Sequence, residues 1–222
     1  MYDAGSGHLH PLKYLIGISN AAEKTGVKIY TKTRICSIKT ANDKNKLITK
    51  EGHVIRSKNL VICGNAYLGS VAPKQMRRRI AQVTSSVMAT EPLSDSEIKG
   101  LIPSKAAIAD GNTALNYFRI DKQKRMIFGG RASYLNRDPI NVEADLKKRM
   151  RAVFPNLSNK KILQAWSGRI GITVNRLPDF GKISDTAIYV QGYSGHGVAF
   201  SQIAGSIVSD AITGREQRFN QF

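Results

Sequence analysis

Residues 189–205 read YVQGYSGHGVAFSQIAG, and this stretch decides the fold class. A short apolar strand over Ala187–Gln191 leads into a turn with three glycines, and an apolar helix is expected from about Val198 to Ile212. Glycine lets the backbone approach a ligand closely, and a helix N-terminus offers unpaired N–H groups with a partial positive charge. The pattern therefore predicts an α/β unit whose turn suits a phosphate or a delocalised anion. A plain glycine-rich connection between a strand and a helix is the alternative.

The beginning of the chain also alternates between helix and strand. A helical pattern covers residues 10–26, residues 27–38 alternate as a strand, and residues 46–56 form an expected hairpin. The run NLVIC at residues 59–63 is apolar on both faces, which is typical of a strand in the middle of a parallel sheet.

From about Arg77 the pattern changes to longer, strand-like segments with one expected helix over residues 142–154. The strands are expected over residues 80–90, 114–120, 125–131 and 161–174. We therefore predict an α/β (α+β) chain in which a mostly antiparallel β domain interrupts an α/β domain. The expected parts are residues 1–76, residues 77–185 and residues 186–222.

The composition fits a folded protein without a membrane span. Hydrophobic residues make up 41% of the 222, enough for a core, and no apolar run approaches the roughly 18 residues that a spanning helix needs. The net charge of +18 raises the hypothesis of a nucleic-acid partner, but no nucleic-acid-binding motif supports it. Cys36 and Cys63 lie in apolar runs without ligand spacing, so we expect buried, reduced thiols, a cytoplasmic protein and no metal.

Several motifs, in order along nearly the whole chain, resemble the D-amino-acid oxidase-like family of FAD-dependent oxidoreductases. They are HLHPLKYLIGISNAAEKTGVKIYTKTRI (8–35), NLVICGNAYLG (59–69), WSGRIGITVNRLPDFG (166–181) and GYSGHG (192–197). Within the family, the segments around residues 1–14, 168–181 and 191–197 look most like gamma-glutamylputrescine oxidoreductases.

The resemblance implies an incomplete Rossmann-like FAD-binding domain, formed by residues 1–76 and 186–222, and a substrate domain over residues 77–185. It implies that the helix after GYSGHG points its N-terminus at the flavin ring. The implied cofactor contacts are Arg34, Ile35, Gly64, Gly192, Gly195, His196, Gly197 and Val198. Tyr193 and His196 are the candidate catalytic residues, and Tyr117, Arg119 and Arg169 are the candidate substrate-binding residues. Some members of the family attach FAD covalently through a cysteine near the segment that matches residues 166–181. That segment has no cysteine here, so the resemblance implies a non-covalent FAD.

Two departures from the family refine these expectations. The family opens with a βαβ unit that carries G-x-G-x-x-G, whereas this sequence begins at the family's middle, so we expect a truncated chain that binds FAD weakly by itself. The arginine that many relatives place four residues after the tryptophan is Ile170 here, with Arg169 one position earlier. This favours a small-molecule amine, such as gamma-glutamylputrescine, oxidised by hydride transfer to flavin N5.

Three alternatives stay open. The first alternative is that the chain is an inactive remnant. The second is that it is one half of a split flavoenzyme whose N-terminal half is encoded separately. A basic nucleic-acid-binding protein is the third and least favoured.

Overall fold

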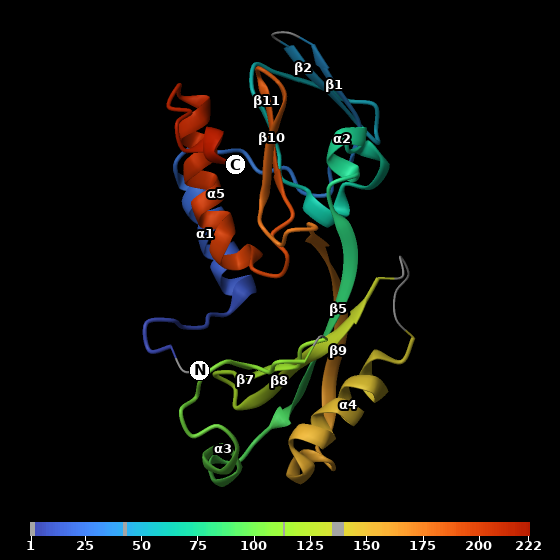
Figure 1. Ribbon diagram of the computed structural model, residues 1–222, viewed down its shortest axis with the longest axis vertical. Helices are drawn as coiled ribbons and strands as arrows, with labels where there is room; N and C mark the ends of the chain where they lie inside the picture. The colour runs from blue at the N-terminus through green and yellow to red at the C-terminus, as the bar shows by residue number, and fades with distance from the viewer. Residues whose placement is uncertain (1–2, 42–43, 113, 135–139) are drawn as a thin grey trace. The chain divides into compact units, whose positions relative to one another are not determined.

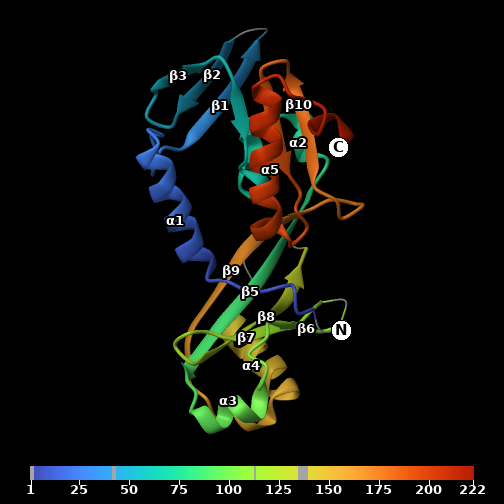
Figure 2. The ribbon, with the colours of Figure 1, turned by 90° about the vertical axis from the view of Figure 1, so that its left-hand side faces the viewer.

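The computed structural model describes residues 3–41, 44–112, 114–134 and 140–222 (Figures 1 and 2). The chain forms two compact units. Unit 1 comprises Met1–His10 and Val83–Arg169, and unit 2 comprises Pro11–Gln82 and Ile170–Phe222. One boundary lies between His10 and Pro11, and the other two lie within β5 (Ala81–Pro92) and β9 (Ile162–Ile172).

Unit 2 contains two three-stranded sheets. The first is antiparallel, in the order β1-β2-β3, and consists of β1 (Ile35–Ala41), β2 (Lys44–Thr49) and β3 (Val54–Ser57). The second has the order β10-β11-β4 and consists of β10 (Asp179–Ser184), β11 (Ala187–Gln191) and β4 (Leu60–Ile62). The pair β11–β4 is parallel, as a Rossmann-like sheet requires, and β10 pairs with β11 in the antiparallel direction.

The core of unit 2 lies between β11 and α5 (Gly197–Ile212). All five residues of β11 are buried, so both faces of the strand are covered. From α5 the buried residues are Ala204, Ile207, Val208 and Ala211, the spacing of one helix face. This packing fixes the C-terminal half of α5, while the first turns of the helix remain exposed.

Helix α1 (Pro11–Lys24) has no buried residue. Its apolar side chains Leu12, Leu15, Ile16 and Ile18 are each 44–60% exposed. It touches α5 through the hydroxyl of Tyr14, which donates to Gln202 Oε1 at 2.8 Å. The helix thus presents an apolar stripe that nothing in the described part of the chain covers.

Unit 1 is a five-stranded sheet in the order β6-β7-β8-β5-β9. Besides β5 and β9 it contains β6 (Ile108–Ala109), β7 (Tyr117–Ile120) and β8 (Arg125–Ser133). Helix α4 (Val142–Val153) buries Leu146 and Met150 against Met88 and Phe128. Helix α3 (Asp95–Leu101) begins with a capping box between Ser94 and Glu97. The short helix α2 (Lys74–Arg77) completes the helices in the described residues.

The predicted α/β (α+β) class is confirmed, and the expected helices and most strands are present. The strand expected over residues 27–38 is wrong in its first half, because only Ile35 onward has a ladder partner among the described residues. Among the described strands β4 lies at a sheet edge rather than in the middle. The division at residues 77 and 185 stays a prediction, since the two units are defined by contacts and not by what they bind.

The expected burial of the two cysteines is also wrong, since both are free and exposed. Cys36 lies at a register irregularity between Ile35 and Ser37, which takes it out of the regular ladder. Cys63 follows the last residue of β4, at the end of a short edge strand.

Candidate flavin and substrate sites

The glycine turn between β11 and α5 contains three residues with positive φ: Gly192 (71°), Ser194 (52°) and Gly195 (99°). The turn reverses the chain so that α5 begins directly after it, with His196 as the N-cap residue. The Phe200 N–H donates to the His196 carbonyl at 3.1 Å, which starts the helical ladder. In the turn, the N–H groups of Gly192, Ser194 and His196 already donate within the chain. The N–H groups of Gly197, Val198 and Ala199, in the first turn of α5, have no partner within the helix. A Cβ at Gly195 would meet nothing within 4 Å, so the backbone there is open to a ligand.

Asn65 ties the glycine turn to the end of β4. Its Oδ1 accepts the Gly192 N–H at 3.0 Å, and it would lie 2.2 Å from a Cβ at Gly171. Asn65 itself has a φ of 46°, a conformation that asparagine tolerates better than most residues. Three chain segments, after β4, at the end of β9 and after β11, therefore meet around one amide side chain.

Ser194 holds the other side of the turn. Its N–H donates to the Gly171 carbonyl at 3.0 Å, and its hydroxyl accepts the Thr173 N–H at 3.3 Å. Ile172 and Tyr193 form an isolated antiparallel bridge beside it. The positive-φ conformation is thus imposed by hydrogen bonds on both sides, which preorganises the backbone at the helix N-terminus.

A buried polar network supports the strand that enters the turn. Gln191 Nε2 donates to Asp179 Oδ2 at 2.9 Å and to the Met76 carbonyl at 3.0 Å. Arg79 Nε donates to Asp179 Oδ1 at 2.8 Å. The bond to Asp179 raises the pKa of the Arg79 guanidinium.

The two candidate catalytic residues differ in surroundings. His196 is exposed, and its ring stands edge-on to Phe200 with centroids 6.3 Å apart. Tyr193 is half-buried and packs against the cluster around Phe180 and Val190. Burial in the first place, and the negative charge of an ionised Cys63 in the second, raise the pKa of Tyr193 to about 12.

The Tyr193 phenol is expected to stay neutral well above the pH at which an ordinary tyrosine ionises. Its pKa in the unfolded chain is about 10, so the resulting stabilisation is complete below that pH and is lost as the pH rises towards about 12. An ultraviolet titration of phenolate in the wild type and in Tyr193→Phe tests this. The difference between the two curves should be a single late-titrating phenol, and an early one contradicts the expectation.

The predicted cofactor contacts Arg34, Ile35 and Gly64 lie at the start of β1 and after β4. The Arg34 carbonyl accepts the Lys50 N–H at 2.8 Å, and Ile35 pairs with Thr49. A Cβ at Gly64 would lie 2.4 Å from Leu68 Cγ, so packing excludes a side chain there. Gly64 precedes Asn65, which places it beside the glycine turn. These roles remain predictions.

Tyr117 and Arg119 lie on one face of β7 in unit 1. The Tyr117 ring covers Gly129, where a Cβ would come within 2.0 Å of the ring. The Tyr117 hydroxyl lies 3.0 Å from Ser85 Oγ, and burial raises the pKa of Tyr117.

Arg119 Nη1 donates to the Leu9 carbonyl at 2.8 Å and to His8 Nδ1 at 2.9 Å. The other ring nitrogen of His8 lies 3.1 Å from the Lys105 carbonyl, which can only accept. His8 therefore carries its proton on Nε2 and accepts at Nδ1. Arg119 thus anchors the segment before α1.

Arg169 lies two residues after Ser167 on β9 and shares its face. Ser167 meets Ser86 with 2.8 Å between hydroxyls, and Tyr117 meets Ser85. The register of β5 is irregular between Ser85 and Ser86, so these two contacts do not assign Arg169 and Tyr117 to faces. A shared role of Arg169 and Tyr117 in substrate binding stays a prediction.

Sequence reasoning missed Asn65, Ser194 and Asp179. The signal for Asn65 was the Gly-Asn pair directly after a short strand, a left-handed turn signature. Asp179 sits within the Pro-Asp-Phe-Gly segment, but its partners Arg79 and Gln191 are far away in the sequence, so no local pattern identifies the network.

A parallel strand pair that leads through a preorganised glycine turn into a helix is the arrangement of a Rossmann-like nucleotide-binding unit. The chain belongs to the family of FAD-dependent oxidoreductases (DAO), which it matches over residues 1–211. It is 36% identical over 226 aligned residues to the protein named "Probable oxidoreductase OrdL" of Haemophilus influenzae, covering all of this chain and 51% of that protein. It is 32% identical over 222 residues to gamma-glutamylputrescine oxidoreductase of Escherichia coli, covering all of this chain and 52% of that protein.

The fold comparison agrees with the family. The crystal structure of fructosyl amine:oxygen oxidoreductase (Amadoriase I) from Aspergillus fumigatus superimposes with a TM-score of 0.77 at 16% identity, over 96% of this chain and 53% of that one. The chain therefore spans about half the length of the proteins it matches.

Among the described residues, none of the helices has the length and apolar character of a membrane-spanning segment. The described residues also contain no group of three His, Cys, Asp or Glu side chains arranged to hold a metal ion.

Proposed function

We propose that the chain provides the flavin-ring side of a non-covalent FAD site in an oxidoreductase that oxidises an amine or amino acid. The observation that carries this proposal is the open, hydrogen-bonded glycine turn at the N-terminus of α5. The N–H groups in the first turn of α5 and the helix dipole suit the negative charge that a flavin ring gains on reduction. The Gly195 backbone, with nothing within 4 Å of a Cβ position, leaves room for a planar ring.

FAD, when bound, supplies the hydride acceptor of the reaction. The chain's own residues contribute position and electrostatics. Gly197, Val198 and Ala199 at the start of α5 offer backbone donors, and Tyr193 remains a neutral hydrogen-bonding group at physiological pH. Tyr117 and Arg119 are the proposed substrate contacts, with Arg119 held by its bonds to the segment that precedes α1.

A gamma-glutamylputrescine-like amine is the proposed substrate, and the cytoplasm is the proposed location. The support is the likeness to the Escherichia coli enzyme of that name and the apolar Ile170 in place of an arginine. A substrate whose carboxylate lies far from the reacting carbon does not need a clamp at that position.

Val198→Asp tests the flavin-ring site without harming the helix. Val198 is 48% exposed in the first turn of α5, where an acidic residue stabilises a helix. The same charge opposes a reduced or electron-rich flavin, so we expect FAD affinity to fall about 10-fold, with helix stability kept or increased. Val198→Asn is the matched neutral control. Flavin fluorescence titration measures the affinity, and equal affinities of the two variants would contradict the proposed site.

A separately encoded partner is the proposed source of the pyrophosphate-binding half. The exposed apolar stripe of α1 and the free edge of β4 give it a surface to cover. Co-expression with the portion of the Haemophilus influenzae relative that this chain does not match should give a yellow complex. That complex should oxidise gamma-glutamylputrescine in preference to glycine or D-alanine. Oxidation of simple amino acids alone would refute the substrate, and stoichiometric FAD on this chain alone would refute the need for a partner.

A further inference from the structure

The sheet β1-β2-β3 carries a row of cations that the sequence alone does not reveal. Lys39 of β1 stands opposite Lys46 of β2, and Lys46 stands opposite Arg56 of β3. Residues directly opposite on paired strands point to the same face, with Cα atoms about 5 Å apart. Lys44 lies two positions from Lys46 and shares that face. These four residues are called the cationic face.

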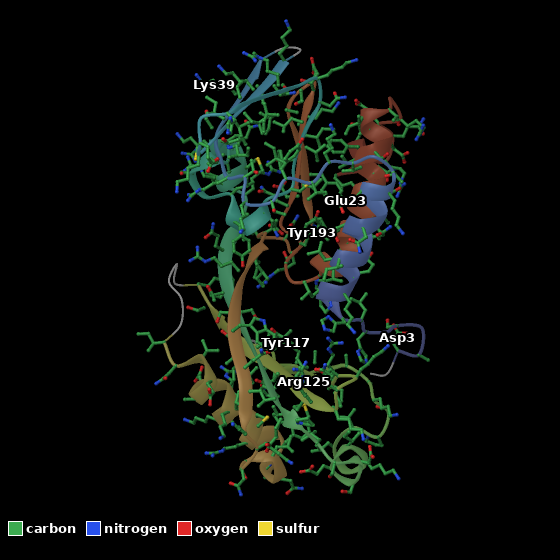
Figure 3. All side chains as sticks on the ribbon, turned by 180° about the vertical axis from the view of Figure 1, so that it is seen from behind. Asp3, Glu23, Lys39, Tyr117, Arg125 and Tyr193 are labelled. Atoms are coloured by element: carbon green, nitrogen blue, oxygen red, sulfur yellow. The ribbon has the colours of Figure 1, made fainter. Side chains whose placement is uncertain are left out.

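The cationic face is the outer face of the sheet. On the opposite face, Ile38 packs against the buried cluster of Ile62, Met76 and Tyr189. All four cations are exposed, and Lys39 lies at the outside of the ribbon in Figure 3.

Within residues 3–41, 44–112, 114–134 and 140–222, no acidic side chain pairs with this row. Among the described residues, none of the four cations takes part in a salt bridge. Residues 11–82 contain 15 Lys and Arg against 3 Asp and Glu, a net +12 of the chain's +18. Like charges directly opposite on a sheet lower its stability. Repulsion within the row therefore lowers the stability of the sheet in the free protein, and an anionic partner would neutralise this repulsion.

The rest of the face indicates which anionic partner fits. Ile48 pairs with Val54 in the neighbouring position on the same face, and Val54 is 43% exposed. The face carries no aromatic residue, although stacking on aromatic side chains is the usual second element of single-stranded nucleic-acid binding. Cations beside exposed aliphatic side chains suit the headgroup region of an anionic bilayer.

We infer that the cationic face docks the protein on an anionic lipid surface. The four cations contact the headgroup phosphates and carboxylates, and the Ile48–Val54 pair lies against the boundary of the acyl region. The protein then works as a peripheral enzyme at the cytoplasmic leaflet, where anionic lipids are concentrated.

Vesicle sedimentation tests this inference. The full chain is mixed with phosphatidylcholine vesicles that contain or lack phosphatidylserine. The variant Lys39→Gln/Lys46→Gln/Arg56→Gln is compared with Lys99→Gln/Lys122→Gln/Lys148→Gln, which removes the same charge from exposed positions of unit 1. We expect the first variant to partition about 100-fold more weakly into anionic vesicles and the second to change far less. Raising the salt concentration should weaken the wild type in the same way.

Thermal unfolding in low salt tests whether the Lys39→Gln/Lys46→Gln/Arg56→Gln variant is still folded. Removing the row should leave the melting temperature unchanged or higher, because the opposed charges repel each other. Equal loss of binding in both triple variants would overturn the inference, because it would reduce the effect to net charge. Equal binding to neutral vesicles would also overturn it, as would displacement of the protein from anionic vesicles by equimolar DNA phosphate. None of these outcomes bears on the flavin site, which Val198→Asp tests separately.

Discussion

Replacement of Gly192 by alanine is expected to destabilise the folded chain by about 4 kcal/mol, the largest effect of any single substitution proposed for this protein. Two costs add at this position. Gly192 has a φ of 71°, where a side chain is strained by about 1–2 kcal/mol. A Cβ there would also lie 2.5 Å from Thr173 Cγ2, and overpacking of this kind costs about 1–3 kcal/mol.

Thr173 cannot easily turn away from the new methyl group. Its hydroxyl donates to the Leu177 carbonyl at 2.8 Å, and its β-branched side chain is buried. A rotation that relieves the contact breaks this bond. Denaturant unfolding with the linear extrapolation method measures the loss directly.

Two further variants separate the costs. Gly195→Ala has the same kind of positive φ, 99°, with nothing within 4 Å of the Cβ, so it should lose only the torsional part. Gly192→Ala/Thr173→Ser removes the clashing methyl and keeps the hydroxyl, so it should recover about 2 kcal/mol. If Gly192→Ala is no worse than Gly195→Ala, then the close packing around the turn is not what holds it.

The glycine turn also shows which features the sequence alone can predict. The strand over residues 187–191 and the helix that follows are local patterns, and the structure has them within a residue of the prediction. The need for glycine at position 192 is different, because it comes from the φ of 71° and from Thr173 and Ile80, whose side chains would lie 2.5 and 3.2 Å from a Cβ there. Local periodicity carries no information on such meetings of separate segments.

The strand predicted over residues 27–38 failed for a related reason. Its alternation of apolar residues is real, and Val27, Ile29 and Tyr30 are exposed in the structure. A strand needs a neighbour for its backbone groups, and none of the described strands forms a ladder with residues 27–34. The apolar alternation makes a strand possible over residues 27–34, but a strand forms only where a neighbouring strand pairs with the segment.

The cationic face is a feature that the sequence pattern did not predict and that the strand pairing creates. Nothing in the sequence sets apart Lys39, Lys46 and Arg56 from the other lysines and arginines. Only the strand register brings them into a row. A basic composition was visible from the start, but its concentration on one sheet depends on the hairpin geometry.

Replacement of Asp179 by alanine is the second large effect, with an expected loss of about 3 kcal/mol in the free energy of unfolding. The Asp179 side chain is only 7% exposed and holds both Arg79 and Gln191. Its removal leaves the fully buried Gln191 amide with one acceptor fewer, and Arg79 without its carboxylate. Arg79 is 59% exposed and regains water, which keeps the loss below that of a fully buried pair.

Glu216→Ala is the matched control in the same unit. Glu216 pairs with Lys182 at 2.7 Å, but both side chains are accessible, so this variant should cost less than about 1 kcal/mol. Because Gln191 directly precedes Gly192, Asp179→Ala should also weaken FAD binding to the reconstituted enzyme, whereas Glu216→Ala should not. Similar unfolding curves for the two variants would mean that the Arg79–Asp179–Gln191 network does not hold the strand that leads into the turn. The preorganisation of the helix N-terminus would then have to come from Asn65 and Ser194 alone.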